Sequence, residues 1–342
     1  MTKRSKNSHH NKNLGLVQND SNYLRNAVLA IFSVLLMSCE KEELPVPAHD
    51  PGNVITNSVQ MEADYRYQLF FDLETNTMVK KNFKKIWDLG FEASENGYRV
   101  ILNSAKAMFV ANTYQADFFA VSDTVGLNFR WDAISGNLDS TAVDDWRGTN
   151  DVYVIDRGFD EAGLHQGFSK IVFLSVASDE YLVKFSNLDG TNEMTLTIAK
   201  NDSFNFSFLS LDGNIVSAQP EKEDWDLVFS QYTHVFEGNP PTPYLVTGCL
   251  NNRNKVEVAA VFDKDFDSIT LDDKEGYSFY GDINMIGYNW KEYSFNSGSY
   301  TIFIDKNYII KSTEEKYYKF HFIDFYDALG AKGNPTFEFQ EL

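Results

Sequence analysis

Two five-residue stretches of this chain almost repeat each other, Trp87-Asp88-Leu89-Gly90-Phe91 and Trp225-Asp226-Leu227-Val228-Phe229. They lie 138 residues apart, and residues upstream match at the same spacing, because Phe70 falls on Phe208. Each stretch alternates large apolar and other residues, as does a strand that buries one face. The repeat therefore predicts a duplicated β domain with both tryptophans buried in its cores.

A second match supports the duplication, since Phe168–Phe173 resembles Tyr317–Phe322 at a spacing of 149 residues. Repeats usually differ in loop length, so we predict one copy at 54–200 and a second, with longer loops, at 201–342. No stretch keeps a convincing helical period with caps at both ends, and the fold class is predicted as all-β with antiparallel sheets in both halves. In the first copy, strand-like runs separated by turn signals occur at 67–71, 87–91, 100–102, 108–110, 152–155, 171–176 and 181–185.

The composition favours a β-rich globular protein, and the net charge limits which partners it can bind. Aromatic residues make up 15% of the chain, which supplies enough bulk for sizeable β-rich cores. The formal net charge is −19, and residues 1–38 carry a local +4, so the remainder carries −23. A body this acidic repels phosphate backbones, and nucleic acid is excluded as an expected partner.

The N-terminus resembles a bacterial lipoprotein signal. An apolar run at 27–37 ends in Ser38-Cys39, and it is too short for a permanent membrane span. We predict a signal peptide at 1–38, lipid attachment at Cys39 and an acidic, proline-rich tether at 39–53. The acids directly after Cys39 resemble the export signal of Bacteroidetes surface lipoproteins, which implies an outer-membrane lipoprotein that faces the exterior.

Catalytic and metal motifs are missing from the sequence. There is no nucleophile elbow, phosphate loop or paired-histidine zinc motif, and the protein is predicted not to be an enzyme. Asp263–Lys274 begins like a calcium loop but lacks the glycine at position six and the glutamate at position twelve, so no metal site is predicted. Paired acids such as Asp144-Asp145 leave a glycan-binding or glycan-cleaving role as a minor alternative.

The second Trp-Asp motif, the strand-turn at Phe208–Asn214 and the C-terminal run Tyr308–Phe339 resemble the HmuY-like haem-binding lipoprotein family. The resemblance covers about 204–342 best and the first copy more weakly. It implies an all-β protein that holds haem between two side chains and passes it to a TonB-linked outer-membrane transporter. Histidine and methionine both ligate haem iron.

The family's ligand pair is not reproduced here. Where its first ligand falls, this chain offers Met285, and where its second falls, Ser294–Gly298 holds no obvious donor. We therefore expect haem, if bound, in the second copy, with Met285 or His234 as candidate ligands. The other reading of Met285 is a gap-filling core residue. The alternative function is a structural or partner-binding accessory lipoprotein that has lost the haem ligands.

Overall fold

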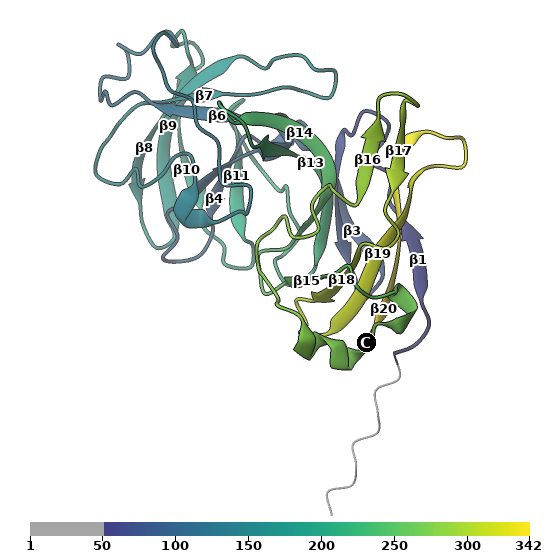
Figure 1. Cartoon of the computed structure of the whole chain (residues 1–342). Helices are drawn as coiled ribbons and strands as arrows, with labels where there is room; N and C mark the ends of the chain where they lie inside the picture. Colours follow the sequence, from purple (N-terminus) through teal and green to yellow (C-terminus); the bar gives the residue numbers. More distant parts are fainter. Residues whose placement is uncertain (1–50) are drawn as a thin grey trace, which may run out of the picture. The chain divides into compact units, whose positions relative to one another are not determined.

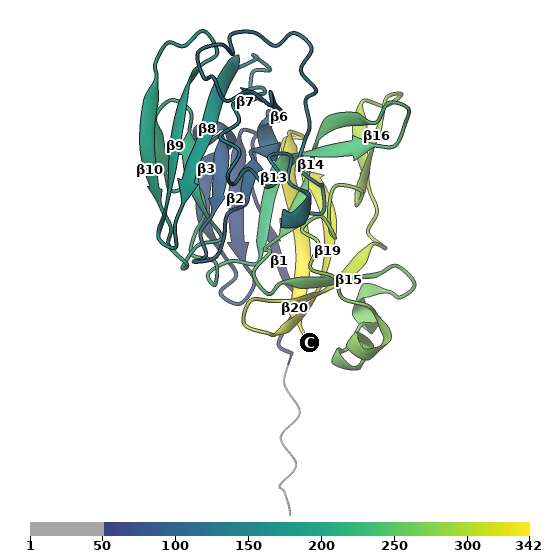
Figure 2. The same cartoon turned by 90° about the vertical axis from the view of Figure 1, so that its left-hand side faces the viewer.

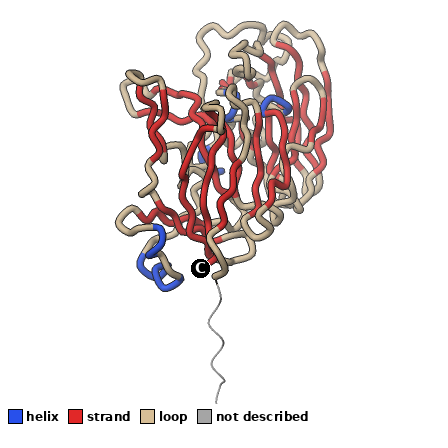
Figure 3. The backbone as a smooth tube through the Cα atoms, turned by 90° about the vertical axis from the view of Figure 1, so that its right-hand side faces the viewer, coloured by secondary structure: helices blue, strands red, loops and turns tan. Residues whose placement is uncertain are grey.

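The computed structural model describes residues 51–342. The predicted signal peptide, Cys39 and most of the tether lie outside the described residues. Strands dominate residues 51–342 (Figure 3), and the helical segments are short 3-10 turns. These turns are η1 (Lys84–Ile86), η2 (Ser104–Lys106), η3 (Leu138–Ser140), η4 (Phe266–Ser268) and η5 (Leu271–Gly276). No helix within 51–342 is long and apolar enough to cross a membrane.

Two antiparallel sheets have five strands each. The first, in the order given, contains β1 (Ile55–Ser58), β20 (Lys332–Glu341), β19 (Tyr317–Tyr326), β18 (Asn307–Lys311) and β15 (Glu257–Val261). The second contains β10 (Met194–Ala199), β9 (Glu180–Asn187), β8 (Phe168–Val176), β7 (Tyr153–Asp156) and β6 (Phe109–Asn112). The matched stretches of the second sequence repeat, β8 and β19, are the central strands of these two sheets.

Two further antiparallel sheets have four strands each. One contains β12 (Asn214–Val216), β11 (Phe206–Ser210), β4 (Leu89–Glu92) and β5 (Val100–Leu102). The other contains β14 (Thr242–Asn251), β13 (Leu227–Phe236), β2 (Tyr67–Asp72) and β3 (Thr77–Phe83). A separate hairpin pairs β16 (Lys291–Ser294) with β17 (Ser299–Ile302). The predicted all-β antiparallel class is confirmed, and the strand-like runs named from the sequence fall on observed strands (Figures 1 and 2).

Strands pair across the limit predicted between residues 200 and 201. β2 belongs to the first predicted copy but pairs with β13, and β11 belongs to the second but pairs with β4. The two four-stranded sheets thus have corresponding strand orders. In each of them, the strand that follows the Trp-Asp motif pairs with a strand from the other predicted copy. The domain limits 54–200 and 201–342 stay a prediction.

The two Trp-Asp motifs make the same backbone bonds. Asp88 N–H donates to Leu209 O at 2.8 Å, and Asp226 N–H donates to Phe71 O at 2.9 Å. Each aspartate carbonyl also accepts from the N–H of an asparagine downstream, Asn103 or Asn252. The strands themselves begin at the leucine after each aspartate, so the tryptophans precede β4 and β13.

Both tryptophans are buried, as predicted, and each meets a phenylalanine edge-on. Trp87 lies 4.7 Å from Phe208, and Trp225 lies 4.9 Å from Phe70, measured between ring centroids. The sequence matched Phe70 to Phe208 at the spacing of the tryptophans. The matched pairs are therefore crossed in space, which is the packing counterpart of the strand pairing.

The main core draws on both ends of the described chain. It includes residues from Val59 to Leu73 together with residues from Leu227 to Phe339, among them the fully buried Trp290. Gln340 Nε2 donates to Gly52 O at 2.8 Å, so the C-terminal strand lies beside the start of the described chain (Figure 1). Cys249 is buried in this core, and burial raises the pKa of its thiol, as suits a small core residue and not a nucleophile.

Candidate functional site

His234 lies near the end of β13, where the strand leaves the core. Its ring is half-buried, 4.8 Å from the ring of Phe236 and 4.8 Å from that of Tyr288 between centroids. Burial lowers the pKa of His234, which favours the neutral imidazole near pH 7. Its Nδ1 is buried and has no hydrogen-bond partner. A neutral imidazole is the form that ligates iron.

The other histidines of residues 51–342 are already engaged. His165 Nε2 lies 2.7 Å from Asp156 Oδ1. His321 lies between the Ile304 carbonyl and the Glu338 carboxylate, and its ring stacks on Phe266 at 4.0 Å. His234 therefore differs from both in having a ring nitrogen that is buried and unpartnered.

Aromatic side chains surround His234 and reach solvent. Phe236 contacts Tyr244 and Tyr288, with ring centroids 6.3 and 6.0 Å away. The exposed fractions of Phe236 and Tyr244 are 39% and 63%. We call His234, Phe236, Tyr244 and Tyr288 the aromatic patch. It lies over the end of β13 and the start of β14. Flat apolar ligands stack on such surfaces, and an imidazole among the rings adds a nitrogen that can ligate a metal.

Met285 lies elsewhere. It is half-buried and packs against the main core, whose cluster includes its neighbours Ile286 and Trp290. Ile283 and Tyr288, which flank Met285 in the sequence, pack instead against a second cluster with Trp225 and Tyr232. The residues around Met285 are thus divided between two clusters, and the packing of Met285 matches the gap-filling role left open by the sequence.

The backbone of segment 281–290 approaches β14 closely, which holds the segment in place. Cys249 and Gly287 exchange two backbone hydrogen bonds of 3.0 and 2.9 Å. A Cβ on Gly248 would lie 2.3 Å from the Gly287 carbonyl oxygen, and Gly287 itself has a φ of +64°. Only glycine suits both demands, so segment 281–290 is held directly on β14. This contact places Tyr288 beside His234.

The loop expected to hold the second ligand is the turn between β16 and β17. Its hydroxyls bond one another, with Ser297 Oγ and Ser299 Oγ 2.8 Å apart, and Phe295 at its tip is 93% exposed. Tyr293 of the same hairpin contacts Tyr300 at 5.0 Å between centroids. The hairpin thus offers exposed aromatic surface but no histidine, methionine or cysteine.

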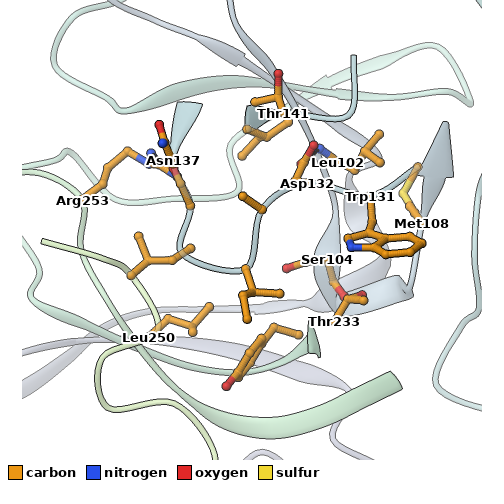
Figure 4. A pocket seen from close by; sticks show the side chains of 16 residues that line it. Leu102, Ser104, Met108, Trp131, Asp132, Asn137, Thr141, Thr233, Leu250 and Arg253 are labelled. Carbon is orange, nitrogen blue, oxygen red and sulfur yellow. Dashed lines mark hydrogen bonds between the residues drawn. The ribbon is translucent and has the colours of Figure 1, made fainter. Parts of the chain in front are cut away.

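A small, partly open pocket lies among β5, η2, segment 131–141 and β13–β14, and Figure 4 shows its lining. Its volume is about 70 Å³, and a neighbouring cavity that shares Leu102, Leu250 and Arg253 has about 100 Å³. Pockets for drug-sized ligands span about 300–1,000 Å³. Neither cavity can admit a porphyrin, although each has room for water.

Two charged groups at this cavity were not found from the sequence. Asp132 accepts backbone N–H bonds from Leu102 and Ala142, both at 2.7 Å, and burial raises its pKa to about 6. Arg253 donates to the Gly136 carbonyl at 3.0 Å, and burial lowers its pKa to about 10. No local motif marks them, because 121 residues separate the two.

An open groove of about 340 Å³ lies on β11 and β12. It is lined by Phe204, Phe206, Phe208 and Ile215 with small and amide residues, and its lining contains no histidine, methionine, cysteine or tyrosine. Such a groove can hold an apolar ligand but cannot ligate iron. Of the places described, the aromatic patch alone combines exposed rings with an unpartnered imidazole nitrogen.

The model of the HmuY protein family matches residues 64–339. The chain belongs to the HmuY family. One match spans nearly all the described residues, both members of each sequence repeat included. At the level of the family, this match supports a binding protein of the haem-binding lipoprotein type.

Solved structures with similarity to this HmuY-family chain are distant. Apo PinO from Porphyromonas gingivitis is 9% identical with a TM-score of 0.28, and the match covers 85% of this chain and 98% of that one. The apo HmuY analog TFO from Tannerella forsythia is 11% identical with a TM-score of 0.23, over 86% of this chain and 98% of that one. No curated protein matches the sequence.

Proposed function

We propose that this protein is a surface-anchored lipoprotein that binds haem, or a related flat ligand, at the aromatic patch and delivers it to a TonB-linked transporter. The observation that carries the proposal is His234, whose pKa is lowered by burial and whose ring lies between those of Phe236 and Tyr288 at the exposed end of β13. Phe236, Tyr244 and Tyr288 would face the porphyrin, and His234 would supply the axial nitrogen.

The affinity follows from the surroundings of His234. Metal-bound histidines usually donate their other ring N–H to a carboxylate or carbonyl, which orients the ring, and Nδ1 of His234 has no such acceptor. Met285 packs in a different cluster and is the weaker candidate ligand. We therefore expect haem to bind less tightly than at a two-histidine site.

The test is the visible spectrum of the purified protein titrated with hemin. The parent should give a shifted Soret band, and His234→Ala should abolish the shift. His165→Ala is the matched control, since His165 is an exposed histidine already bonded to Asp156, and it should behave as the parent does. Met285→Ala reports whether the thioether contributes. Identical spectra for parent and His234→Ala would reject His234 as the ligand.

A second candidate is an accessory lipoprotein of HmuY fold without haem. It is favoured by the turn at Ser294–Gly298, which has no iron donor, and by the core packing of Met285. Under this reading hemin causes no spectral change in the parent. The exposed rings of the aromatic patch and of Phe295 would then contact a protein partner.

The anchor is Cys39, which lies outside the described residues, and we place the lipidated protein on the exterior of the outer membrane. A lipoprotein cysteine carries several acyl chains, which makes attachment stable where a single chain would not. Protease treatment of intact cells that removes the protein supports this location, and full protection from protease contradicts it.

A further inference from the structure

Asp226 of the second Trp-Asp motif carries a fully buried carboxylate. Its Oδ2 accepts the Leu73 N–H at 3.0 Å and its Oδ1 accepts the Thr313 N–H at 2.9 Å. Both N–H groups stabilise the ionised form of the carboxylate. Burial raises the pKa of Asp226 to about 7, an effect that the two N–H groups oppose and that nearby Glu314 and Asp72 increase.

Two more carboxylates converge on Asp226. One oxygen each from Asp72, Asp226 and Glu314 lies within 4.8 Å of the others. Asp72, at the end of β2, is 5% exposed, and its Oδ2 accepts from Thr75 whereas its Oδ1 is buried without a partner. Glu314 is exposed, in the turn after β18, and leaves the cluster open to solvent.

The phenol of Tyr318 lies close enough to Asp226 and Glu314 for both to raise its pKa. The Tyr318 side chain is 3% exposed and its hydroxyl is buried without a partner. Burial raises its pKa, and Glu341, Glu74, Asp226 and Glu314 raise it further. Two buried polar oxygens, from Asp72 and Tyr318, thus lack hydrogen-bond partners. Glu74 and Glu341 pair with Lys316, so the charge left without an ion pair is that of Asp72, Asp226 and Glu314, and burying unpaired carboxylates is costly.

The first Trp-Asp motif shows how the fold satisfies the same carboxylate. Asp88 is equally buried and accepts the Leu211 N–H at 2.7 Å, as Asp226 accepts that of Leu73. It is ion-paired to Lys106, and to Arg157 at 2.9 Å. Among residues 51–342, none of Asp72, Asp226 and Glu314 forms an ion pair. Asp88 of the first motif is thus next to two cations, whereas Asp226 of the second is next to two acids.

We propose that Asp72, Asp226 and Glu314 bind a divalent cation of the calcium class. The donors are all oxygens, without histidine or cysteine, which favours calcium or magnesium over zinc. Calcium accepts mono- and bidentate carboxylates at about 2.3–2.6 Å in irregular geometry, and two ligands at such distances lie up to about 5 Å apart. Magnesium requires about 2.0–2.1 Å and near-octahedral geometry, which three carboxylates held by separate strands and a turn satisfy less readily.

The cation would tie β2, the start of β13 and the turn between β18 and β19 together at one edge of the main core. Asp72 and Asp226 would be the buried ligands, and Glu314 would close the site from solvent. The inference is independent of haem, because these residues lie outside the aromatic patch.

The test is calcium binding by the purified protein at pH 8 after treatment with EGTA. Calcium at about ten times its Kd should raise Tm by about 2–4 °C. Terbium, a luminescent calcium substitute, should show emission excited through Trp225 or Tyr318 that calcium displaces. Glu314→Gln should weaken calcium binding about tenfold or more, since ligand charge sets calcium affinity.

Glu315→Gln is the matched control, an adjacent exposed acid outside the cluster, and it should bind calcium as the parent does. Because Glu314 is exposed, its substitution leaves the fold intact and a loss of binding is interpretable. No rise in Tm and no calcium-displaced terbium emission would overturn the proposal. Equal stabilisation by magnesium would overturn the assignment to calcium, and weakening by Glu315→Gln equal to that by Glu314→Gln would overturn the site.

Discussion

Asp88→Asn tests the ionic centre of the first Trp-Asp motif. Asp88 is fully buried and Lys106 is 2% exposed, so solvent and salt screen their ion pair little. The substitution leaves Lys106 without its anion and removes the charged partner of Arg157. Breaking a buried pair from one side costs about 3–5 kcal/mol. Burial also lowers the pKa of Lys106, and an ammonium that loses its proton is less costly to leave unpaired. We therefore expect Asp88→Asn to lower the free energy of unfolding by about 3 kcal/mol at pH 7.

The measurement is urea unfolding followed by tryptophan fluorescence, read as a change in midpoint at constant m-value. Glu161→Gln is the control, because Glu161 pairs with the exposed Lys85, and surface pairs contribute about 0–1 kcal/mol. The double variant Asp88→Asn/Lys106→Met should recover about 1–3 kcal/mol of the loss, since the stranded ammonium is gone. If Asp88→Asn moves the midpoint no more than Glu161→Gln, the reasoning about the buried pair is wrong.

Three further predictions concern the two tryptophans, Asp132 and the anchor cysteine. Trp87→Ala and Trp225→Ala should each lower the free energy of unfolding by about 3–5 kcal/mol, because both rings pack edge-on in cores; a loss under about 1 kcal/mol in urea unfolding of either variant contradicts this. The pKa of Asp132 is raised to about 6, so its contribution to stability is full below its unfolded pKa of about 3.9 and is lost as the pH rises through about 6, a change of about 2–3 kcal/mol. Between pH 4 and 7 the free energy of unfolding of the parent should therefore fall by about 2–3 kcal/mol relative to that of Asp132→Asn. Parallel curves for the two proteins would refute the assignment. Cys39→Ala should move the protein out of the membrane fraction and abolish palmitate labelling, whereas unchanged fractionation and labelling would rule out lipidation at Cys39.

Local patterns in the sequence were sufficient for the strands and the class of fold. The alternation in Trp87–Phe91 predicted β4 to within two residues, and the turn at Leu211–Asn214 lies between β11 and β12, with Gly213 at a φ of +97°. These features depend on residues close in sequence, because alternation and turn chemistry are properties of a few neighbouring residues. Burial of Trp87 and Trp225 was predictable for the same reason.

Strand partners were decided by tertiary structure alone. Alternation states which face of a strand is buried but not which strand it joins, since any two amphipathic strands satisfy the same pattern. The pairing of β2 with β13 and of β4 with β11 therefore could not be found by placing one repeat over the other. The match of Phe70 with Phe208 showed only that β2 and β11 are equivalent strands.

The chemistry of each site also depended on the tertiary structure. Asp88 and Asp226 occupy equal places in the sequence repeat, yet one meets Lys106 and Arg157 and the other meets Asp72 and Glu314. The sequence named His234 and Met285 as equals, and packing put one among exposed rings and the other against the core. A pKa, an ion pair or an unpartnered nitrogen is set by groups that folding brings from distant parts of the chain, because electrostatic and hydrogen-bonding effects act over a few ångströms in space.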